Sequence, residues 1–388
     1  MICISKRRSR TLVLLFTLAV LFLLPHPFVT SAQKRNTPRA AKPKSTSRPK
    51  ASPTPTPGPF DALGAPPPVP TLRQKREEQE VTAGDVISVN TTEVMIPVTV
   101  RDASGRLVPE LTRNDFRVFE NDSLQPLSDL ALRQVPVDVV LMVDASSSVA
   151  TNLDDFRRAA EGFAGRLTSE DRISLIKFDD RVELLQDWTH SRFQLRRALD
   201  RIEPGMFTRF NDALLLAARE QFGETKSRKA VIVLSDGIDS GRGASTLETA
   251  LQALLRSQVS VYVVSNTEIS RAAKRAELDA LTGGSTAAVR FNQLRIDDLR
   301  EGLRVLDLSE QMLAQLTAAT GGRLYKPQTF AGLEATYAEV AEELRHQYAV
   351  YYTPLNKARD GVFRRIRVEM TNPAYQGHTR VGYFAPKS

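Results

Sequence analysis

Apolar residues recur over residues 81–133 in short stretches that are separated by turn residues. In Phe116-Arg-Val-Phe-Glu120, apolar and polar residues alternate, and this period of two is typical of half-buried strands. Pro97 lies inside the apolar stretch Val94–Val100, and proline is tolerated in a sheet mainly on an edge-type strand. The pattern therefore predicts a small N-terminal β unit over residues 81–133, with Pro97 on an edge-type strand.

From Val137 onward, longer apolar runs alternate with segments of helical period. Val137–Val143, Ala230–Leu234 and Val259–Val264 are almost continuously apolar, which is typical of strands that are buried on both faces. Helical periods lie between them, for example over 153–167 and 211–222. Strands that alternate with helices form right-handed βαβ units. We therefore predict an α/β fold over residues 134–346, with a doubly wound, mostly parallel, Rossmann-like sheet.

The pattern changes again after Val264. Residues 268–308 are charged and of helical period, and they are longer than an ordinary connection, which predicts a helical insertion. A separate helix is expected over 308–319. Apolar stretches near the C-terminus predict further strands within residues 347–388. Because strands then lie at both ends of the α/β core, we expect the C-terminal strands to pack with the N-terminal β unit.

The first 32 residues have the composition of a signal peptide. A positive region that includes Lys6 and Arg10 precedes the apolar run Thr11–Leu24, and Thr30-Ser-Ala32 offers small residues for cleavage. The alternative is an uncleaved anchor, but prolines follow the run before it reaches the ~20 apolar residues of a membrane span. The leader predicts an exported protein, whether periplasmic, on the cell surface or secreted.

Residues 33–80 are rich in proline, threonine, serine and alanine, which is typical of an extended, disordered linker. The linker could tether the protein to a membrane or cell wall, or it could be a spacer. The leader and the linker together account for the positive net charge of the chain. Eleven lysines and arginines precede Asp61 without any acidic residue, so the net charge of +8 becomes 8 − 11 = −3 for the remainder. A nucleic-acid partner is therefore not expected.

Oxygen-bearing side chains follow two of the predicted strands. Asp144-Ala-Ser146-Ser-Ser148 comes directly after one strand, Asp236 follows another, and Thr208 lies in a loop between two helices. Ligands of α/β folds bind at the carboxyl ends of parallel strands. Carboxylates and hydroxyls are ligands for hard cations, so Mg²⁺ is expected, or Mn²⁺ or Ca²⁺ in its place. Because the hydroxyls are neutral, such a metal keeps enough positive charge to attract an incoming carboxylate.

This spacing resembles the metal-ion-dependent adhesion site (MIDAS) of von Willebrand factor type A (VWA) domains, which follows the pattern Asp-x-Ser-x-Ser, then Thr, then Asp. The resemblance implies five metal ligands, which are Asp144, Ser146, Ser148, Thr208 and Asp236. The segments 98–120 and 343–354 further resemble the VWFA-related family of exported bacterial proteins. The resemblance implies the fold and the metal site, and it supplies no known ligand. From the charge that such a metal keeps, we predict an adhesion-type module that captures a protein ligand through an Asp or Glu carboxylate.

Three nearby carboxylates are assigned other roles. Asp212 could orient the site from outside the coordination sphere, or it could be an ordinary helix carboxylate. Asp179 and Asp180 are expected in a solvated turn.

Two alternatives to the binding module stay open at the level of sequence. One is an envelope scaffold in which the metal is structural. The other is a Mg²⁺-dependent hydrolase that uses Asp144 and Asp236. Against an enzyme, the four histidines show no metal-ligand spacing, and the only cysteine lies in the leader. The chain also contains neither a nucleophile elbow nor a phosphate-binding glycine loop, so we predict no catalytic residues.

Overall fold

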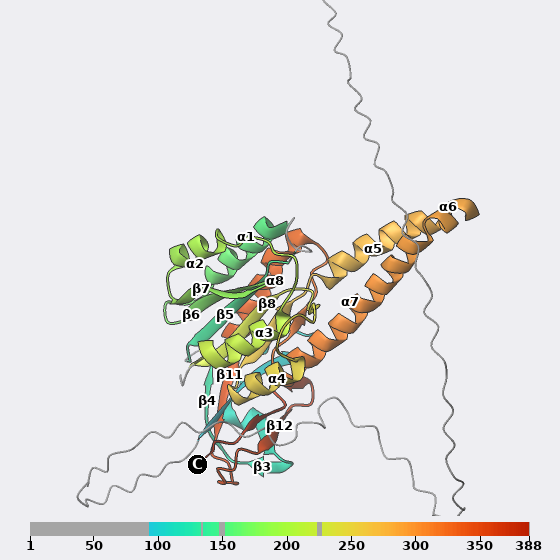
Figure 1. Cartoon of the computed structure of the whole chain (residues 1–388). Coiled ribbons are helices and arrows are strands. Elements are labelled where there is room, and N and C mark those ends of the chain that lie inside the picture. The colour runs from blue at the N-terminus through green and yellow to red at the C-terminus, as the bar shows by residue number, and fades with distance from the viewer. Residues whose placement is uncertain (1–92, 133–134, 147–151, 223–226, 388) are drawn as a thin grey trace, which may run out of the picture. The chain divides into compact units, whose positions relative to one another are not determined.

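The computed structural model describes residues 93–132, 135–146, 152–222 and 227–387 (Figure 1). The predicted signal peptide and linker, and the start of the predicted β unit, lie outside these residues. A six-stranded sheet with the order β10-β9-β8-β5-β6-β7 forms the centre of the described part. Its strands are β5 (Val137–Asp144), β6 (Arg172–Phe178), β7 (Val182–Thr189), β8 (Arg228–Leu234), β9 (Ser260–Val264) and β10 (Leu324–Tyr325). All neighbours run parallel except β7, which is antiparallel to β6.

Helices cover both faces of this sheet (Figure 1). One face packs against α1 (Leu153–Ala164), α2 (Arg192–Leu199) and α8 (Leu333–Arg345). The other packs against α3 (Phe210–Leu216), the π-helical turn η3 (Ala217–Gln221), α4 (Leu247–Arg256) and the end of α7 (Gln293–Thr320). Successive residues of β5 alternate between the two cores, since Leu141 belongs to the first and Met142 to the second. The doubly wound α/β prediction is confirmed.

Strands from the two ends of the described chain form a separate β unit of two antiparallel sheets, with the orders β13-β1-β11-β4 and β14-β12-β2-β3. The N-terminal strands are β1 (Val94–Asp102), β2 (Phe116–Glu120), β3 (Ser123–Gln125) and β4 (Leu127–Leu132), with a 3-10 turn η1 (Arg113–Asp115) before β2. The C-terminal strands are β11 (Tyr348–Tyr352), β12 (Phe363–Met370), β13 (Tyr375–His378) and β14 (Gly382–Phe384). Because β1 pairs with β11 and β2 with β12, the expected union of the N- and C-terminal segments is confirmed.

The position of Pro97 in this unit is more specific than the sequence indicated. Strand β1 lies between β11 and β13, so part of it is an interior strand of the sheet. Strand β13 pairs only with Thr99–Asp102, however, so Pro97 has a neighbouring strand on one side only. The strand is an edge at the position where an N–H group is missing.

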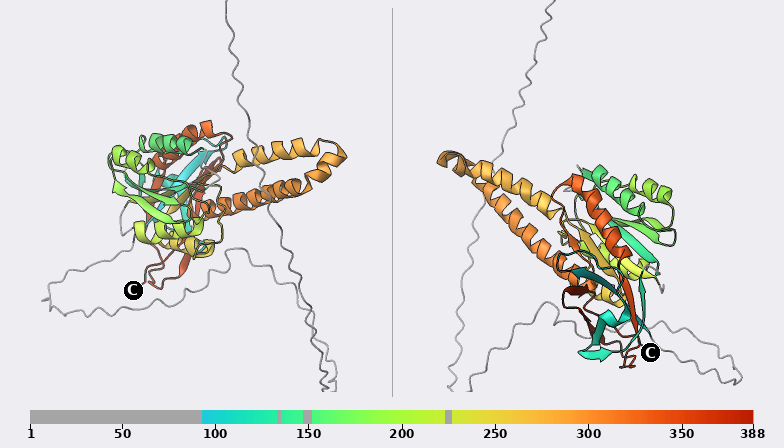
Figure 2. Two further views of the ribbon diagram at one scale, coloured as in Figure 1. Left: turned by 45° about the horizontal axis from the view of Figure 1, so that its top comes forward. Right: turned by 180° about the vertical axis from the view of Figure 1, so that it is seen from behind.

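The helices α5 (Thr267–Thr282), α6 (Thr286–Phe291) and α7 form a hairpin that starts directly after β9 (Figures 1 and 2). Helix α7 runs unbroken to Thr320 and ends at Gly321, whose φ of 76° is left-handed. The expected start of a separate helix at residue 308 is therefore wrong. After α7 come the 3-10 turn η4 (Phe330–Gly332) and α8. In the described part of the chain, no helix is both long and apolar enough to span a membrane.

Candidate metal centre

Asp144 is the last residue of β5 and is fully buried. Its Oδ1 accepts a hydrogen bond from the backbone N–H of Ser146 at 2.8 Å, and its Oδ2 accepts one from the hydroxyl of Ser235 at 2.6 Å. Ser235 directly follows β8, and its Oγ also accepts the N–H of Gly237 at 2.9 Å. No sequence pattern singles out Ser235, although its side chain orients Asp144 and joins the ends of two neighbouring strands.

Asp236 lies beside Asp144 because Val143 of β5 pairs with Leu234 of β8. It is 7% exposed, and its Oδ1 accepts the N–H of Ile238 at 3.1 Å. Burial, together with the nearby negative charge of Asp236, raises the pKa of Asp144 to about 6. Burial likewise raises the pKa of Asp236. Each buried carboxylate makes the negative charge of the other less favourable, and a bound cation would offset this repulsion.

Thr208 lies in a loop that contacts both carboxylate-bearing segments. Its N–H donates to the hydroxyl of Ser240 at 2.6 Å, and the N–H of Ser240 donates to the carbonyl of Thr208 at 2.9 Å. The N–H of Gly205 donates to the carbonyl of Ala145 at 2.8 Å. The structure therefore brings Asp144, Ser146, Thr208 and Asp236 to one edge of the sheet. Ser148 lies outside the described residues.

Asp179 and Asp180 lie in the turn between β6 and β7, as predicted, but the prediction that this turn is solvated is wrong for Asp179. Asp179 is 3% exposed and contacts the Lys177 ammonium at 2.6 Å. The carboxylate of Asp180 accepts the N–H groups of Met206 and Phe207 at 3.0 and 3.1 Å. A Cβ at Gly205 would lie 2.6 Å from Cγ of Asp179, so only glycine fits there. The two aspartates hold the loop that carries Thr208, a contact that local sequence cannot reveal.

Asp212, in the first turn of α3, anchors a different loop. Its carboxylate accepts the N–H groups of Ala244 and Ser245, the latter at 2.8 Å. Glycine at position 243 allows this loop to approach so closely, because a Cβ there would lie 2.7 Å from Oδ2 of Asp212. Asp212 therefore positions the segment that follows Asp236 in the chain. A role in orienting a metal ligand stays a prediction.

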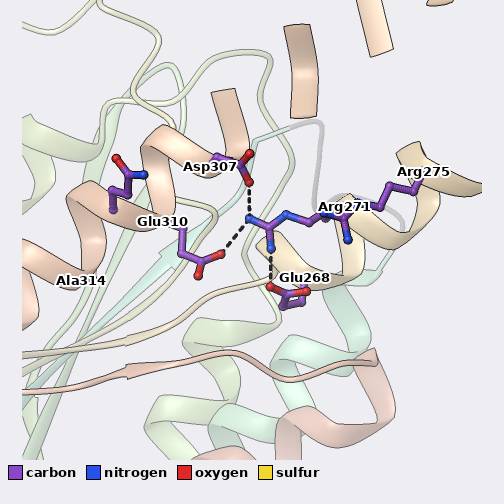
Figure 3. Close-up of a pocket in the computed structure, with 7 residues that line it drawn as sticks. Glu268, Arg271, Arg275, Asp307, Glu310 and Ala314 are labelled. Carbon is purple, nitrogen blue, oxygen red and sulfur yellow. Dashed lines mark hydrogen bonds and ion pairs between the residues drawn. The ribbon is translucent and has the colours of Figure 1, made fainter. Parts of the chain in front are cut away.

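Helix α7 contacts the same edge of the sheet. The hydroxyl of Ser309 donates to the carbonyl of Asp236, and a Cβ at Gly237 would lie 2.6 Å from a methyl of Leu313. On the same turn, Asp307 and Glu310 accept hydrogen bonds from the buried guanidinium of Arg271 at 2.9 and 2.8 Å (Figure 3). These charged residues line a pocket of about 470 Å³ at the base of the hairpin. The hairpin is thereby joined to the loop that carries Asp236.

The donors at this edge of the sheet fit a hard cation. The described residues contain no cluster of three or more His, Cys, Asp or Glu side chains that could bind a metal. The predicted ligand set has only two carboxylates and is completed by hydroxyls, which are donors for Mg²⁺ and similar ions. None of the ion pairs between described residues includes Asp144 or Asp236, and the charge of Lys274 lowers the pKa of Asp236 by less than burial raises it.

Residues 138–302, which include Asp144, Thr208 and Asp236, match the family model described as the von Willebrand factor type A domain. The chain contains a VWA domain. VWA domains are usually non-catalytic modules that bind protein ligands, and MIDAS motifs within them bind divalent cations.

Similar proteins are known from several organisms. Two UPF0353 proteins from strains of Mycobacterium leprae are each 24% identical in a 243-residue alignment that covers 57% of this chain. The chain spans 64% of the length of those relatives.

Solved structures that match part of the chain include the conserved hypothetical protein BatB from Bacteroides thetaiotaomicron, at 23% identity and a TM-score of 0.30, covering 33% of this chain and 66% of that one. A von Willebrand factor type A structure from Catenulispora acidiphila is 11% identical with a TM-score of 0.42, covering 77% and 64%. Proximal thread matrix protein 1 from the mussel byssus, with a zinc-occupied MIDAS motif, is 15% identical with a TM-score of 0.42, covering 58% and 49%.

Proposed function

We propose that the VWA domain binds a divalent cation, Mg²⁺ or in its place Mn²⁺ or Ca²⁺, and captures an acidic group of a protein partner. The ligands would be Asp144, Ser146, Ser148, Thr208 and Asp236. The observation that carries the proposal is the pair of buried carboxylates, Asp144 and Asp236, at the carboxyl-end edge of the parallel sheet. When bound, the cation would supply an open coordination position for a carboxylate from the partner.

The protein's own groups prepare this position. Ser235 and the N–H of Ser146 each hold one oxygen of Asp144 by a hydrogen bond, so the carboxylate is oriented before any ligand arrives. Hydrogen bonds from the loop of Thr208 to Ser240 and Ala145 keep Thr208 beside the two carboxylates. Preorganisation of this kind lowers the entropic cost of binding.

Hydrogen bonds of the protein itself attach the loops around the site to their neighbours, which favours a binding role over a structural one. Asp180 already holds the loop of Thr208 through the N–H groups of Met206 and Phe207. Asp212 holds the segment after Asp236 in the same way, through Ala244 and Ser245. An envelope scaffold with a purely structural metal is therefore the weaker alternative.

A Mg²⁺-dependent hydrolase is weaker still. Each histidine in the described part of the chain contacts a backbone carbonyl elsewhere in the fold, at distances of 2.8 to 2.9 Å: His190 with Asp171, His346 with Glu342 and His378 with Gly322. These side chains are not placed to act as a general base beside Asp144 and Asp236.

We propose in addition that the protein is exported and that its N-terminal linker tethers or spaces the domain.

Isothermal titration of the EDTA-treated protein with Mg²⁺ and Mn²⁺ tests the cation site. Asp144→Asn is expected to abolish binding, because it removes a buried charged ligand without changing side-chain size. Asp138→Asn is the matched control: Asp138 is also buried on β5, but it pairs with Arg172 at the opposite end of the strand. Unchanged metal affinity in Asp144→Asn would contradict the proposal, and circular dichroism verifies that both variants fold.

Pull-downs with and without EDTA then test capture. The proposal predicts that a protein partner is retained in Mg²⁺ and released by EDTA. Stabilisation by Mg²⁺ without metal-dependent capture of any partner would favour the scaffold instead.

A further inference from the structure

Two arginines lie on the loops that carry the candidate ligands. Arg209 directly follows Thr208, and Arg242 belongs to the segment after Asp236. The guanidinium carbon of Arg242 lies 3.6 Å from the ring centroid of Phe207, the residue that precedes Thr208. The exposed Arg242 is therefore held beside Thr208 by stacking on an aromatic ring.

The carboxylates of these loops are turned toward backbone N–H groups. Asp180 and Asp212 accept hydrogen bonds from the loops as described above, and Asp239 accepts the N–H groups of Asn211 and Gly241 at 2.9 and 2.7 Å. Within the described residues, Arg242 forms no ion pair, and the ion pair of Arg209 is a long one, 3.8 Å to Asp212. The acidic groups thus stabilise the loops, while positive charge faces the solvent.

Arg242 can still donate hydrogen bonds while it stacks on Phe207. The guanidinium carbon lies over the ring of Phe207, but Arg242 is exposed, so the N–H groups that point away from the ring remain able to donate. Paired N–H donors in that geometry match the two oxygens of a carboxylate. Met206, on the same loop, is 74% exposed and offers an apolar contact at the same place.

We infer that the site recognises an acidic segment of a protein partner through two carboxylates, one bound to the cation and a second bound by Arg242, with Arg209 adding positive charge. The inference rests on the proposed function, because the first carboxylate requires the metal. It adds that the partner carries paired acidic residues and that Arg242 determines specificity.

The test uses the full chain without its leader and surface plasmon resonance on immobilised synthetic peptides. One peptide carries a single glutamate in a glycine-serine background, and the others carry two glutamates separated by zero to three residues. In Mg²⁺, the best two-glutamate peptide is expected to bind about fivefold more tightly than the single-glutamate peptide, the size of a partly exposed ion pair. Arg242→Ala is expected to remove this gain and to leave binding of the single-glutamate peptide unchanged.

Arg256→Ala is the matched control. Arg256 is also exposed and stacks on an aromatic ring, Phe384, at 4.0 Å, but it ends α4 at the opposite edge of the sheet. This control is expected to retain the fivefold gain. Arg242→Lys is expected to retain only part of it, because lysine keeps the charge but has no fork of donors.

The outcomes separate the two proposals. A two-glutamate gain that is the same in Arg242→Ala as in the unaltered protein would overturn the inference while leaving metal-dependent capture intact. Binding that persists equally in EDTA and in Asp144→Asn would instead overturn the proposed function. If no peptide binds the unaltered protein in Mg²⁺, both proposals are wrong.

Discussion

The hydroxyl of Ser235 donates a 2.6 Å hydrogen bond to Oδ2 of Asp144 and so connects the ends of β8 and β5. Both residues are fully buried, and Asp144 has its other oxygen occupied by the N–H of Ser146. The candidate cation site is therefore built on two adjacent parallel strands whose register is fixed by the sheet. Loops alone would hold such a carboxylate less firmly.

Replacement of Ser235 tests this connection. Ser235→Ala leaves one oxygen of Asp144 and the N–H of Gly237 without their partner, so the free energy of unfolding is expected to fall by about 1 to 3 kcal/mol. Urea unfolding in EDTA measures this change. Mg²⁺ affinity is also expected to fall, since the carboxylate is less well oriented. Ser169→Ala, at an exposed position between α1 and β6, is the control and should change neither quantity. Equal stability of Ser235→Ala and the unaltered protein would contradict the assigned role.

Substitution of Gly205 tests the packing of the Thr208 loop. In Gly205→Ala, the added methyl would overlap the buried side chain of Asp179, and such overpacking costs about 1 to 3 kcal/mol. Gly284→Ala is the control, because a Cβ there meets its nearest neighbour, Ala288, at an ordinary 3.5 Å. Thermal unfolding should show a lower midpoint for the first variant only. A Gly205→Ala protein as stable as the control would show that the loop moves away from Asp179 at little cost.

Arg271 is expected to hold the base of the helical hairpin. Its guanidinium is buried among Glu268, Asp307 and Glu310 (Figure 3). Arg271→Met leaves Glu268 and Asp307 without this partner, whereas Glu310 keeps its ion pair with Lys326, so the substitution should destabilise by about 1 to 3 kcal/mol. Hydrogen exchange of α5 and α7 measures the effect locally.

Arg295 provides a matched comparison on the same hairpin. It pairs with Glu277 and Asp298, but its side chain is 50% exposed, so Arg295→Met should cost at most about 1 kcal/mol. Equal hydrogen exchange in the two variants would mean that the pocket residues do not anchor the hairpin.

Removal of the cation should weaken the folded state. A ligand that binds only the native protein stabilises it by about 2.7 kcal/mol at a concentration of 100 times its Kd. Melting in saturating Mg²⁺ should therefore occur at a higher temperature than in EDTA. The difference should vanish in Asp144→Asn and persist in Asp138→Asn. A melting temperature that Mg²⁺ does not change would contradict the cation site.

Much of the fold could be predicted from the sequence because its strands are buried on both faces. Runs such as Val137–Val143 have no other stable location than the centre of a sheet. Proximity of Asp144 and Asp236 followed from the same reasoning, because both follow parallel strands. The positions of the apolar runs, and of the residues that follow them, are therefore sufficient to predict both the architecture and the outline of the site.

What could not be predicted depends on contacts between distant segments. Asp180 is a turn residue, as the sequence predicts, but its role is not local, since only the folded loop brings the N–H groups of Met206 and Phe207 to it. The sequence predicts a charged helical segment that ends near residue 308 and a separate helix over 308–319, whereas α7 is continuous. Its outer part packs on α5, whereas Leu313 and Leu316 pack on the sheet.

Crystals grown with Mn²⁺ test the central claim most directly, because the anomalous signal of manganese locates the ion independently of the protein. The account predicts one strong anomalous peak between the carboxylates of Asp144 and Asp236, within coordination distance of the Thr208 hydroxyl. A map without a peak there, in which water alone separates the two carboxylates, would contradict it.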